Sequence, residues 1–184
     1  MAVKNNRRTI ITKKILKDSL LELMQTKPIS KITIKEICDL SDMSRSTFYL
    51  HYQDQFALLE DIEKEVLEKT FENLKMLDTE SSSISSIEIF LNYIKENKTT
   101  FGILLCQMET HSFQQGIMNS VQSYIQSIIP GLSDKCEEQY IYSFIMHGCL
   151  NIIVDWINND FNIKSDKLAE IIYHVCNNAV YTRL

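Results

Sequence analysis

A run of polar side chains between residues 44 and 51 carries the hydrogen-bonding groups that a nucleic-acid surface requires. The run comprises Ser44, Arg45, Ser46, Thr47, Tyr49 and His51. The guanidinium of Arg45 can donate two parallel hydrogen bonds to a guanine, and hydroxyl groups suit either base edges or phosphate oxygens. Tyr49 and His51 are better suited to phosphates. The run therefore predicts contact with DNA.

Presenting this run to a DNA groove requires two short helices joined by a tight turn. Thr33 and Glu36 have the spacing of a capping box, in which each side chain binds the other residue's backbone N–H, so a helix is expected to start there. Turn-forming residues 40–43 interrupt that helix, and Ser44 is a good N-cap for a second one that runs to about Tyr52. Such a pair places the start of its second helix in the major groove. We therefore predict a helix-turn-helix over residues 33–52.

The same stretch resembles the DNA-binding domain of the TetR family of transcriptional regulators. The resemblance is carried by residues 32–38 (ITIKEIC), 43–52 (MSRSTFYLHY) and 58–59 (LL), and it covers residues 8–59 well. It implies that the start of the second helix contacts bases and nearby phosphates, and that His51 contacts the DNA backbone. The family often has a lysine where this chain has Gln55. The resemblance therefore does not extend to a phosphate contact at that position.

The side chains that we predict to contact DNA lie on both helices of the pair. They are Thr33, Lys35, Ser44, Arg45, Ser46, Thr47, Tyr49, His51 and Tyr52. An ordinary exposed helix pair with a charged surface would contain many of the same residues, because a fold does not fix a function.

Charge is distributed unevenly along the chain, whose net charge is −5. Residues 1–52 contain ten Lys and Arg against five Asp and Glu, a balance of +5, whereas residues 53–184 contain nine against nineteen, a balance of −10. A basic module on an acidic body is the charge pattern of a DNA-binding head. Lys4, Arg7 and Arg8 either touch phosphate or the minor groove, or belong to a loose basic tail.

The composition predicts an all-α fold, because only four Gly and two Pro occur in 184 residues. We expect a three-helix DNA-binding domain over residues 1–55, with its first helix at about 9–25 and the helix-turn-helix at 33–52. A C-terminal helical bundle for dimerisation and effector binding is expected over residues 56–184. On the first helix, the side chains expected to turn inward are Ile11, Ile15, Leu16, Leu20, Leu23 and Met24, and those expected to face outward are Lys13, Lys14 and Lys17.

The second domain is expected to contain several more helices, the first of which links the two domains. They are predicted over residues 54–77, 87–97, 100–107, 112–129 and 134–157, and from the N-cap Ser165 onward, with serine-rich residues 81–86 as a linker.

The last two helices carry apolar repeats that predict a homodimer with a four-helix interface. The predicted interface residues are Ile141, Ile145, Gly148, Ile152, Trp156, Leu168, Ile172, Val175 and Ala179. Tyr140, Phe144, His147 and Asn151 form a second, more mixed stripe, so the first of these helices needs two partners: its own core and another surface. The TetR resemblance also implies dimers, which would place two recognition helices ~34 Å apart on a palindrome.

Aromatic and apolar side chains of the second domain could line an effector pocket. The candidates are Phe90, Tyr93, Phe101, Leu105, Met108, Phe113, Tyr124, Phe144 and His147. Residues at such helical spacing also form ordinary core, and the sequence leaves both alternatives open. It does not identify an effector, which could be a small molecule or a protein.

Sites for metals, cofactors and catalysis are not expected. The pairs His147/Cys149 and His174/Cys176 each place two ligands on nearly opposite sides of a helix, so neither pair can hold one ion alone. The chain contains none of the nucleotide, esterase or zinc-protease motifs. Five dispersed cysteines and no span long enough for a membrane indicate reduced thiols and a cytoplasmic protein.

These features predict a sequence-specific transcriptional regulator. We expect a repressor that binds a palindromic operator as a homodimer and is released by an effector. The alternatives are a helical interaction protein whose basic head binds an anionic partner without sequence preference, and an activator controlled by a protein partner.

Overall fold

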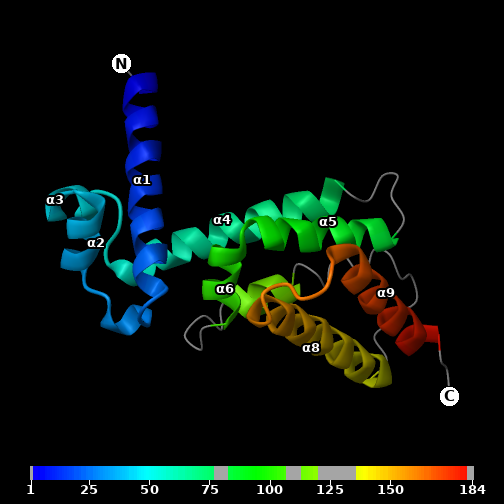
Figure 1. Ribbon diagram of the computed structural model, residues 1–184. Helices are drawn as coiled ribbons and strands as arrows, with labels where there is room; N and C mark the ends of the chain where they lie inside the picture. Colours follow the sequence, from blue (N-terminus) through cyan, green and yellow to red (C-terminus); the bar gives the residue numbers. More distant parts are fainter. Residues whose placement is uncertain (1, 77–82, 107–112, 120–135, 182–184) are drawn as a thin grey trace. The chain divides into compact units, whose positions relative to one another are not determined.

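The computed structural model is built from helices (Figure 1) and describes residues 2–76, 83–106, 113–119 and 136–181. The helices are α1 (Ala2–Met24), the 3₁₀ helix η1 (Ile29–Lys31), α2 (Ile34–Ser41), α3 (Arg45–Tyr49), α4 (Gln55–Met76), α5 (Ser83–Glu96), α6 (Lys98–Cys106), α8 (Cys136–Asn158) and α9 (Ser165–Tyr181). Residues 113–119 are also helical. No strand occurs in the described residues, and the predicted all-α class is confirmed.

The chain forms two compact units that divide within α4. Unit 1 comprises Met1–Val66, and unit 2 begins at Leu67. The sequence pattern suggested a boundary at residue 55, where α4 begins. The first turns of α4 belong with unit 1 because Leu58, Leu59 and Ile62 are buried.

The core of unit 1 is formed where α1 packs against α2. Its fully buried side chains are Leu16, Leu20, Met24, Ile29, Ile32, Ile37, Phe48 and Leu58. Phe48 is the only buried residue of α3, and its side chain has no exposed surface. It therefore anchors this short helix to the core. Burying a side chain of this size stabilises a fold by about 1.5–3 kcal/mol.

The inner face of α1 differs from the expectation. Ile11 is 50% exposed and Ile15 is 38% exposed, whereas Thr12 and Leu16 are buried. Leu16, Leu20 and Met24, which the sequence pattern also turns inward, are buried and repeat every four residues, so the core stripe of α1 excludes Ile11 and Ile15. α1 also begins at Ala2, before the expected start at residue 9. Neither Pro nor Gly occurs in residues 2–9 to prevent a helix there.

Unit 2 is a bundle in which α5 packs on α9, α6 packs on α8, and α8 packs on α9. The helix α5 starts at Ser83, so residues 83–86 are helical and the predicted linker at 81–86 is wrong there. Ser86 is buried, and the apolar repeat of Phe90, Leu91 and Ile94 extends the helix into the serine-rich segment. Of the helix predicted over 112–129, residues 120–129 lie outside the described residues.

Ser165 links α9 to α5. Its hydroxyl donates a 2.6 Å hydrogen bond to Oδ1 of Asn92 rather than capping α9. The backbone carbonyl of Lys164 accepts from the N–H of Leu168 instead. Ser165 therefore fixes the packing of two helices that are distant in sequence.

The turn between α8 and α9 contains two residues with left-handed backbone, Asp160 (φ 50°) and Phe161 (φ 58°). This conformation is unusual for a bulky residue such as Phe161. Its ring packs edge-on against Trp156, with 4.7 Å between centroids, and the Trp156 Nε1–H donates to the carbonyl of Ile163 at 2.9 Å. These contacts hold the turn closed.

In the part of the chain that the structure describes, no helix has both the length and the apolar character needed to cross a membrane.

Candidate nucleic-acid interface

The start of α3 is fixed by its N-cap, Ser44. The Ser44 Oγ accepts a 3.1 Å hydrogen bond from the backbone N–H of Thr47, as predicted for an N-cap. The same oxygen lies 2.7 Å from Ser46 Oγ and 2.9 Å from Thr47 Oγ1. Three hydroxyl groups are therefore gathered at the end of α3 that a helix-turn-helix presents to DNA.

The outer side of α3 is free to contact another molecule. Arg45 and Ser46 are exposed, Tyr49 is 58% exposed, and Thr47 is half-buried. The polar candidates of α3 thus lie on one accessible end and face of the helix, opposite the buried Phe48. His51, just beyond α3, is half-buried.

The turn before α3 depends on a left-handed residue at the end of α2. Asp42 has φ 52° and ψ 40°, and its backbone N–H donates to the carbonyl of Cys38. The backbone N–H of Met43 donates to the same carbonyl, with 3.0 Å between nitrogen and oxygen. Aspartate tolerates this conformation better than most residues, and it directs the chain from α2 into α3.

The predicted capping box at the start of α2 is present. The Glu36 N–H donates to Thr33 Oγ1 at 3.3 Å, and the Thr33 N–H donates to Glu36 Oε2 at 3.0 Å. Lys27 also binds the Glu36 carboxylate. This hydrogen bond, followed by those from Thr33, lowers the pKa of Glu36 from 4.5 to about 2. Thr33 and Lys35 remain exposed at this end of α2.

Tyr52 has a different role from the predicted DNA contact. Its side chain is only 6% exposed, and its hydroxyl donates a 2.7 Å hydrogen bond to Oδ2 of Asp61 on α4. Burial, followed by this hydrogen bond, raises the pKa of the Tyr52 phenol well above its usual range. A hydroxyl held in this way is not available to a phosphate, so Tyr52 supports the helix-turn-helix from behind.

Lysines of α1 complete this support. Lys17 lies 3.1 Å from Asp61 and 2.7 Å from Glu65, and Lys13 lies 3.4 Å from Asp61. The Lys17 side chain is only 15% exposed, although the sequence pattern assigned it to the outer face. Burial opposes ionisation of Asp61, but its hydrogen bonds from Tyr52 and Lys17 outweigh that effect and lower its pKa. The apolar pattern does not reveal these lysine contacts, because each lysine lies 44 or more residues from its acidic partner.

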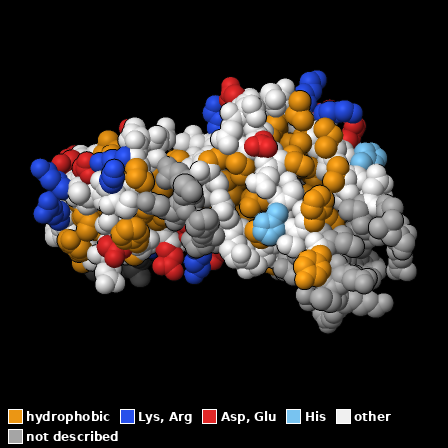
Figure 2. All heavy atoms as spheres, turned by 90° about the horizontal axis from the view of Figure 1, so that it is seen from below, with side chains coloured by type: hydrophobic (Ala, Val, Ile, Leu, Met, Phe, Trp, Pro, Cys, Tyr) orange, Lys and Arg blue, Asp and Glu red, His pale blue; other side chains and the backbone are white. Residues whose placement is uncertain are grey.

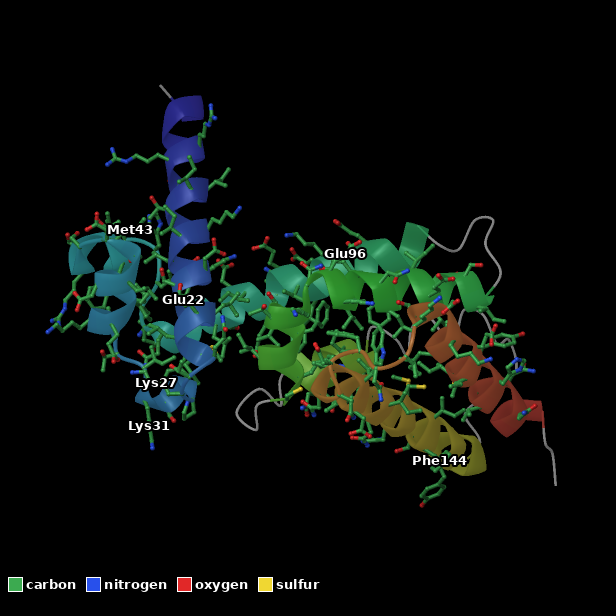
Figure 3. All side chains as sticks on the ribbon, viewed as in Figure 1. Glu22, Lys27, Lys31, Met43, Glu96 and Phe144 are labelled. Carbon is green, nitrogen blue, oxygen red and sulfur yellow. The ribbon has the colours of Figure 1, made fainter. Side chains whose placement is uncertain are left out.

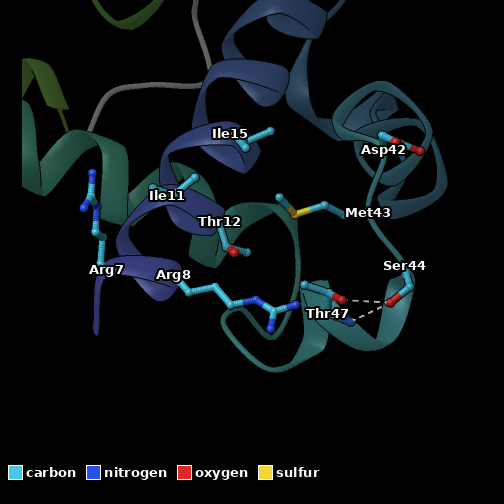
Figure 4. A pocket seen from close by; sticks show the side chains of 9 residues that line it. All are labelled: Arg7, Arg8, Ile11, Thr12, Ile15, Asp42, Met43, Ser44 and Thr47. Carbon is cyan, nitrogen blue, oxygen red and sulfur yellow. Dashed lines mark hydrogen bonds between the residues drawn. The ribbon is translucent and has the colours of Figure 1, made fainter. Parts of the chain in front are cut away.

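An open groove of about 610 Å³ separates the start of α1 from the turn and α3 (Figure 4). It is lined by Arg7, Arg8, Ile11, Thr12, Ile15, Asp42, Met43, Ser44 and Thr47. Figure 4 shows the Arg8 side chain extending toward Thr47. The Arg8 side chain therefore borders the end of α3 that carries the hydroxyl cluster, whereas Arg7 lines the far side of the groove.

A known family model matches most of unit 2. Residues 81–178, more than half of the chain, match the TetR family model described as the transcriptional regulator C-terminal region. The chain belongs to the TetR family of transcriptional regulators.

Solved structures of transcriptional regulators share the fold over 91–96% of this chain. A TetR regulator from Streptococcus agalactiae 2603V covers 96% of this chain and 99% of its own, with a TM-score of 0.74 and 18% identity. FadR from Bacillus subtilis, in complex with stearoyl-CoA, covers 91% of this chain and 97% of its own, with a TM-score of 0.65 and 14% identity. The dihydroxyacetone kinase operon activator DhaS covers 91% of this chain and 95% of its own, with a TM-score of 0.56 and 19% identity.

A curated relative in Bacillus subtilis (strain 168), the HTH-type transcriptional regulator YxbF, is 21% identical over 172 residues. The match covers 87% of this chain and 43% of YxbF, so this chain spans less than half the length of that relative.

The candidates for a TetR effector pocket fall into two groups. Phe90, Phe101, Leu105 and Phe113 are buried, and Tyr93 is half-buried. The ring of Phe101 packs edge-on against that of Tyr93, with 5.5 Å between the ring centroids. The centroid of Phe101 also lies 6.3 Å from that of Phe113, so the three rings form one cluster. Phe144 and His147 are exposed on α8 and do not join this cluster. Met108 and Tyr124 lie outside the described residues.

The predicted dimer residues are likewise divided. Ile145, Trp156, Leu168 and Ile172 are buried within the single chain, which leaves them no surface for a partner. Val175 is 48% exposed, whereas Ile152 and Gly148 are half-buried. The side chains of Ile141 and Ala179 lie outside the described residues.

The exposed side of α8 carries the second, more mixed stripe seen in the sequence. Tyr140, Ser143, Phe144, His147, Gly148 and Asn151 line a shallow hollow of about 510 Å³. Tyr140 is 75% exposed and Phe144 is 71% exposed, and Figure 3 shows Phe144 projecting away from α8. Figure 2 shows hydrophobic side chains at the surface of unit 2 on this face. We call these α8 residues, with Ile171 and Val175 of α9, the outer face of α8 and α9.

Proposed function

We propose that this TetR-family regulator is a repressor that binds a palindromic operator as a homodimer and releases it when an effector binds unit 2. In this proposal α3 lies in the major groove of each half-site, and unit 2 joins the two chains. The site of action is the DNA in the cytoplasm.

The exposed start of α3 carries the proposal. A helix that is anchored by one buried side chain, Phe48, and presents Arg45, three clustered hydroxyls and Tyr49 has the chemistry of direct base reading. Arg45 forms no ion pair within the described part of the chain, so its guanidinium remains available to a guanine. Thr33 and Lys35 at the start of α2, with Arg7 and Arg8 across the groove, would hold phosphates.

The outer face of α8 and α9 supports the homodimer. Two aromatic side chains more than two-thirds exposed on one helix are costly in water and suit an interface core. A Cβ added at Gly148 would meet nothing within 4 Å, so a second helix could approach closely there. Because α8 and α9 both contribute, two copies would form a four-helix interface around a two-fold axis.

A second candidate function differs from the first in its effector and in the direction of regulation. FadR of Bacillus subtilis is complexed with stearoyl-CoA, whereas DhaS is an operon activator. An activator that responds to a protein would use the same α3 and differ in where its operator lies. The buried rings of Phe101 and Phe113 pack on one another, so a small molecule that binds between them would have to separate them.

Selection of bound duplexes from a random library tests the proposal. The selected duplex should be a palindrome whose half-sites are centred about 10 base pairs, or a multiple of one turn, apart. Binding to it should exceed binding to random DNA by at least ~10³-fold. Arg45→Ala should reduce this preference and Tyr49→Ala should weaken binding to the selected duplex, while the circular dichroism spectrum of each variant is unchanged. Weak binding that depends steeply on salt and ignores sequence would instead indicate an interaction protein that senses phosphates only.

A further inference from the structure

Two cysteines from different helices meet inside unit 2. Cys149 lies on α8 and Cys176 lies on α9, 27 residues further along the chain, and their Sγ atoms are 3.5 Å apart. Both side chains are half-buried and both thiols are free. In the sequence each cysteine follows a histidine by two residues, but nothing in that pattern reveals that the two thiols face each other.

The separation suits a disulfide better than a metal ion. Closing the bond requires the sulfur atoms to approach from 3.5 Å to about 2.05 Å, a movement that two side chains can share. A soft cation would need further ligands, and among the described residues no group of three or more His, Cys, Asp or Glu side chains could hold a metal. Oxidation of the two thiols is therefore the chemistry that this arrangement favours.

The pair also has one thiol suited to attack and one suited to resolve. A hydrogen bond from Cys149 lowers the pKa of the Cys176 thiol, although burial opposes this effect. The same hydrogen bond, together with burial, raises the pKa of Cys149. The thiolate is the nucleophilic form of cysteine, so the lowered pKa favours Cys176 as the attacking thiol.

We propose that Cys149 and Cys176 form a peroxide-responsive dithiol whose disulfide cross-links α8 to α9. The Cys176 thiolate attacks one oxygen of hydrogen peroxide, the O–O bond breaks, and the sulfur becomes a sulfenic acid while hydroxide leaves and takes up a proton. The Cys149 thiol then attacks the Cys176 sulfur, and water leaves as the S–S bond forms. Two thiols are oxidised and one peroxide is reduced to two waters.

The cross-link acts at the outer face of α8 and α9. Cys149 directly follows Gly148, and Cys176 directly follows Val175, both of which belong to that face. The disulfide fixes the position of α8 against α9, and hence the shape that this face offers to a second copy. This consequence for dimerisation rests on the homodimer proposed above, whereas the oxidation itself does not.

The oxidation is tested on the full, reduced chain treated with a small excess of hydrogen peroxide. Thiols counted after denaturation should fall from five to three per chain. Peptide mapping without reductant should find one cross-linked peptide that joins Cys149 to Cys176, and dithiothreitol should restore all the thiols. Because the wild-type chain is mapped directly, this result does not depend on how a variant folds.

Matched variants identify the site. Cys106→Ser removes an exposed thiol and should still lose two thiols, whereas Cys149→Ser and Cys176→Ser should yield no disulfide. In Cys149→Ser, sulfenic acid should accumulate on Cys176 and be trapped by dimedone. A cross-link that involves Cys38, Cys106 or Cys136, a disulfide between chains, or peroxide-treated protein with five free thiols would overturn the proposal.

Sedimentation before and after oxidation tests the effect on assembly. The dimer dissociation constant should change by roughly tenfold on oxidation, in the wild type and in Cys106→Ser alike, and should recover with dithiothreitol. A mapped disulfide with an unchanged dissociation constant would overturn the effect on assembly. If the untreated chain were monomeric at all concentrations, the proposed homodimer would fail, and the mapping result would stand apart from it.

Discussion

The hydroxyl of Tyr52 donates a 2.7 Å hydrogen bond to Oδ2 of Asp61, which joins the segment after α3 to α4. Lys13 and Lys17 of α1 reach the same carboxylate, at 3.4 and 3.1 Å. The segment after α3 and the helix α1 therefore both bind one partly buried acid of α4. The position of α3 depends on this acid as well as on Phe48.

Tyr52→Phe should destabilise the protein by about 1–2 kcal/mol, because the partly buried Asp61 loses a donor while the ring remains in place. Urea denaturation measures this loss. Tyr49→Phe is the matched control, since Tyr49 is exposed, and it should leave stability within about 0.5 kcal/mol of wild type. Equal losses in the two variants would show that the Tyr52 hydroxyl has no supporting role.

Arg45→Ala should weaken binding to the selected operator by about 1–3 kcal/mol and relax the preference at one base pair of each half-site. Competition binding with duplexes changed at single positions measures both effects. Lys64→Ala removes the same charge from an exposed position of α4 and should change neither. Loss of affinity with an unchanged base preference would mean that Arg45 contacts phosphate rather than a base.

Arg8→Ala should weaken binding to all duplexes by a similar factor, because a phosphate contact carries no sequence information. The slope of log affinity against log salt should become shallower by about 1. Titrations of operator and random DNA at several salt concentrations measure the slope. An unchanged slope would remove Arg8 from the interface, although it borders the groove beside α3.

The capping box should make unit 1 sensitive to acid. The pKa of Glu36 is about 2 in the folded chain, below its ordinary 4.5, so its ionised form is stabilised by folding. That contribution is complete above pH 4.5 and is lost as the pH falls toward 2. Glu36→Gln should remove the part of the pH dependence of the unfolding free energy that Glu36 contributes between pH 4.5 and about 2. Urea denaturation at a series of pH values gives the comparison, and identical curves for both proteins would contradict the assignment.

Phe144→Glu should weaken the dimer by at least ~10-fold with little loss of helix content, because it places a charge on the exposed face of α8. Ile145→Glu, one residue away but buried, should instead disrupt the fold. Sedimentation and circular dichroism distinguish the two results. Ile89→Glu, on the exposed side of α5, is the control for an added surface charge. A Phe144→Glu variant that dimerises normally would exclude this face.

Features that depend on neighbouring residues could be predicted from the sequence. The capping box of Thr33 and Glu36 and the N-cap Ser44 follow from contacts within four residues, and the structure contains both. Tyr52 could not be assigned in the same way. Its partner Asp61 lies on another helix, and a tyrosine beside a recognition helix suits a phosphate equally well.

The two sides of α8 show the same limit. Ile145 and Trp156 form one apolar stripe, and Tyr140 and Phe144 form another, so the pattern predicts two covered faces without deciding which one the chain covers itself. Packing against α6 and α9 decides it, and the aliphatic stripe with Trp156 becomes the core. A single stripe of apolar residues would have left no such ambiguity.

The turn between α8 and α9 gives the protein a built-in optical reporter. Trp156 is the only tryptophan of the chain, it is 3% exposed, and its indole is held by Phe161 and the carbonyl of Ile163. Its emission should move to longer wavelength when this turn opens to water. Fluorescence excited at the indole band will therefore follow unit 2 alone, and unfolding of the helix-turn-helix can be followed separately by another signal.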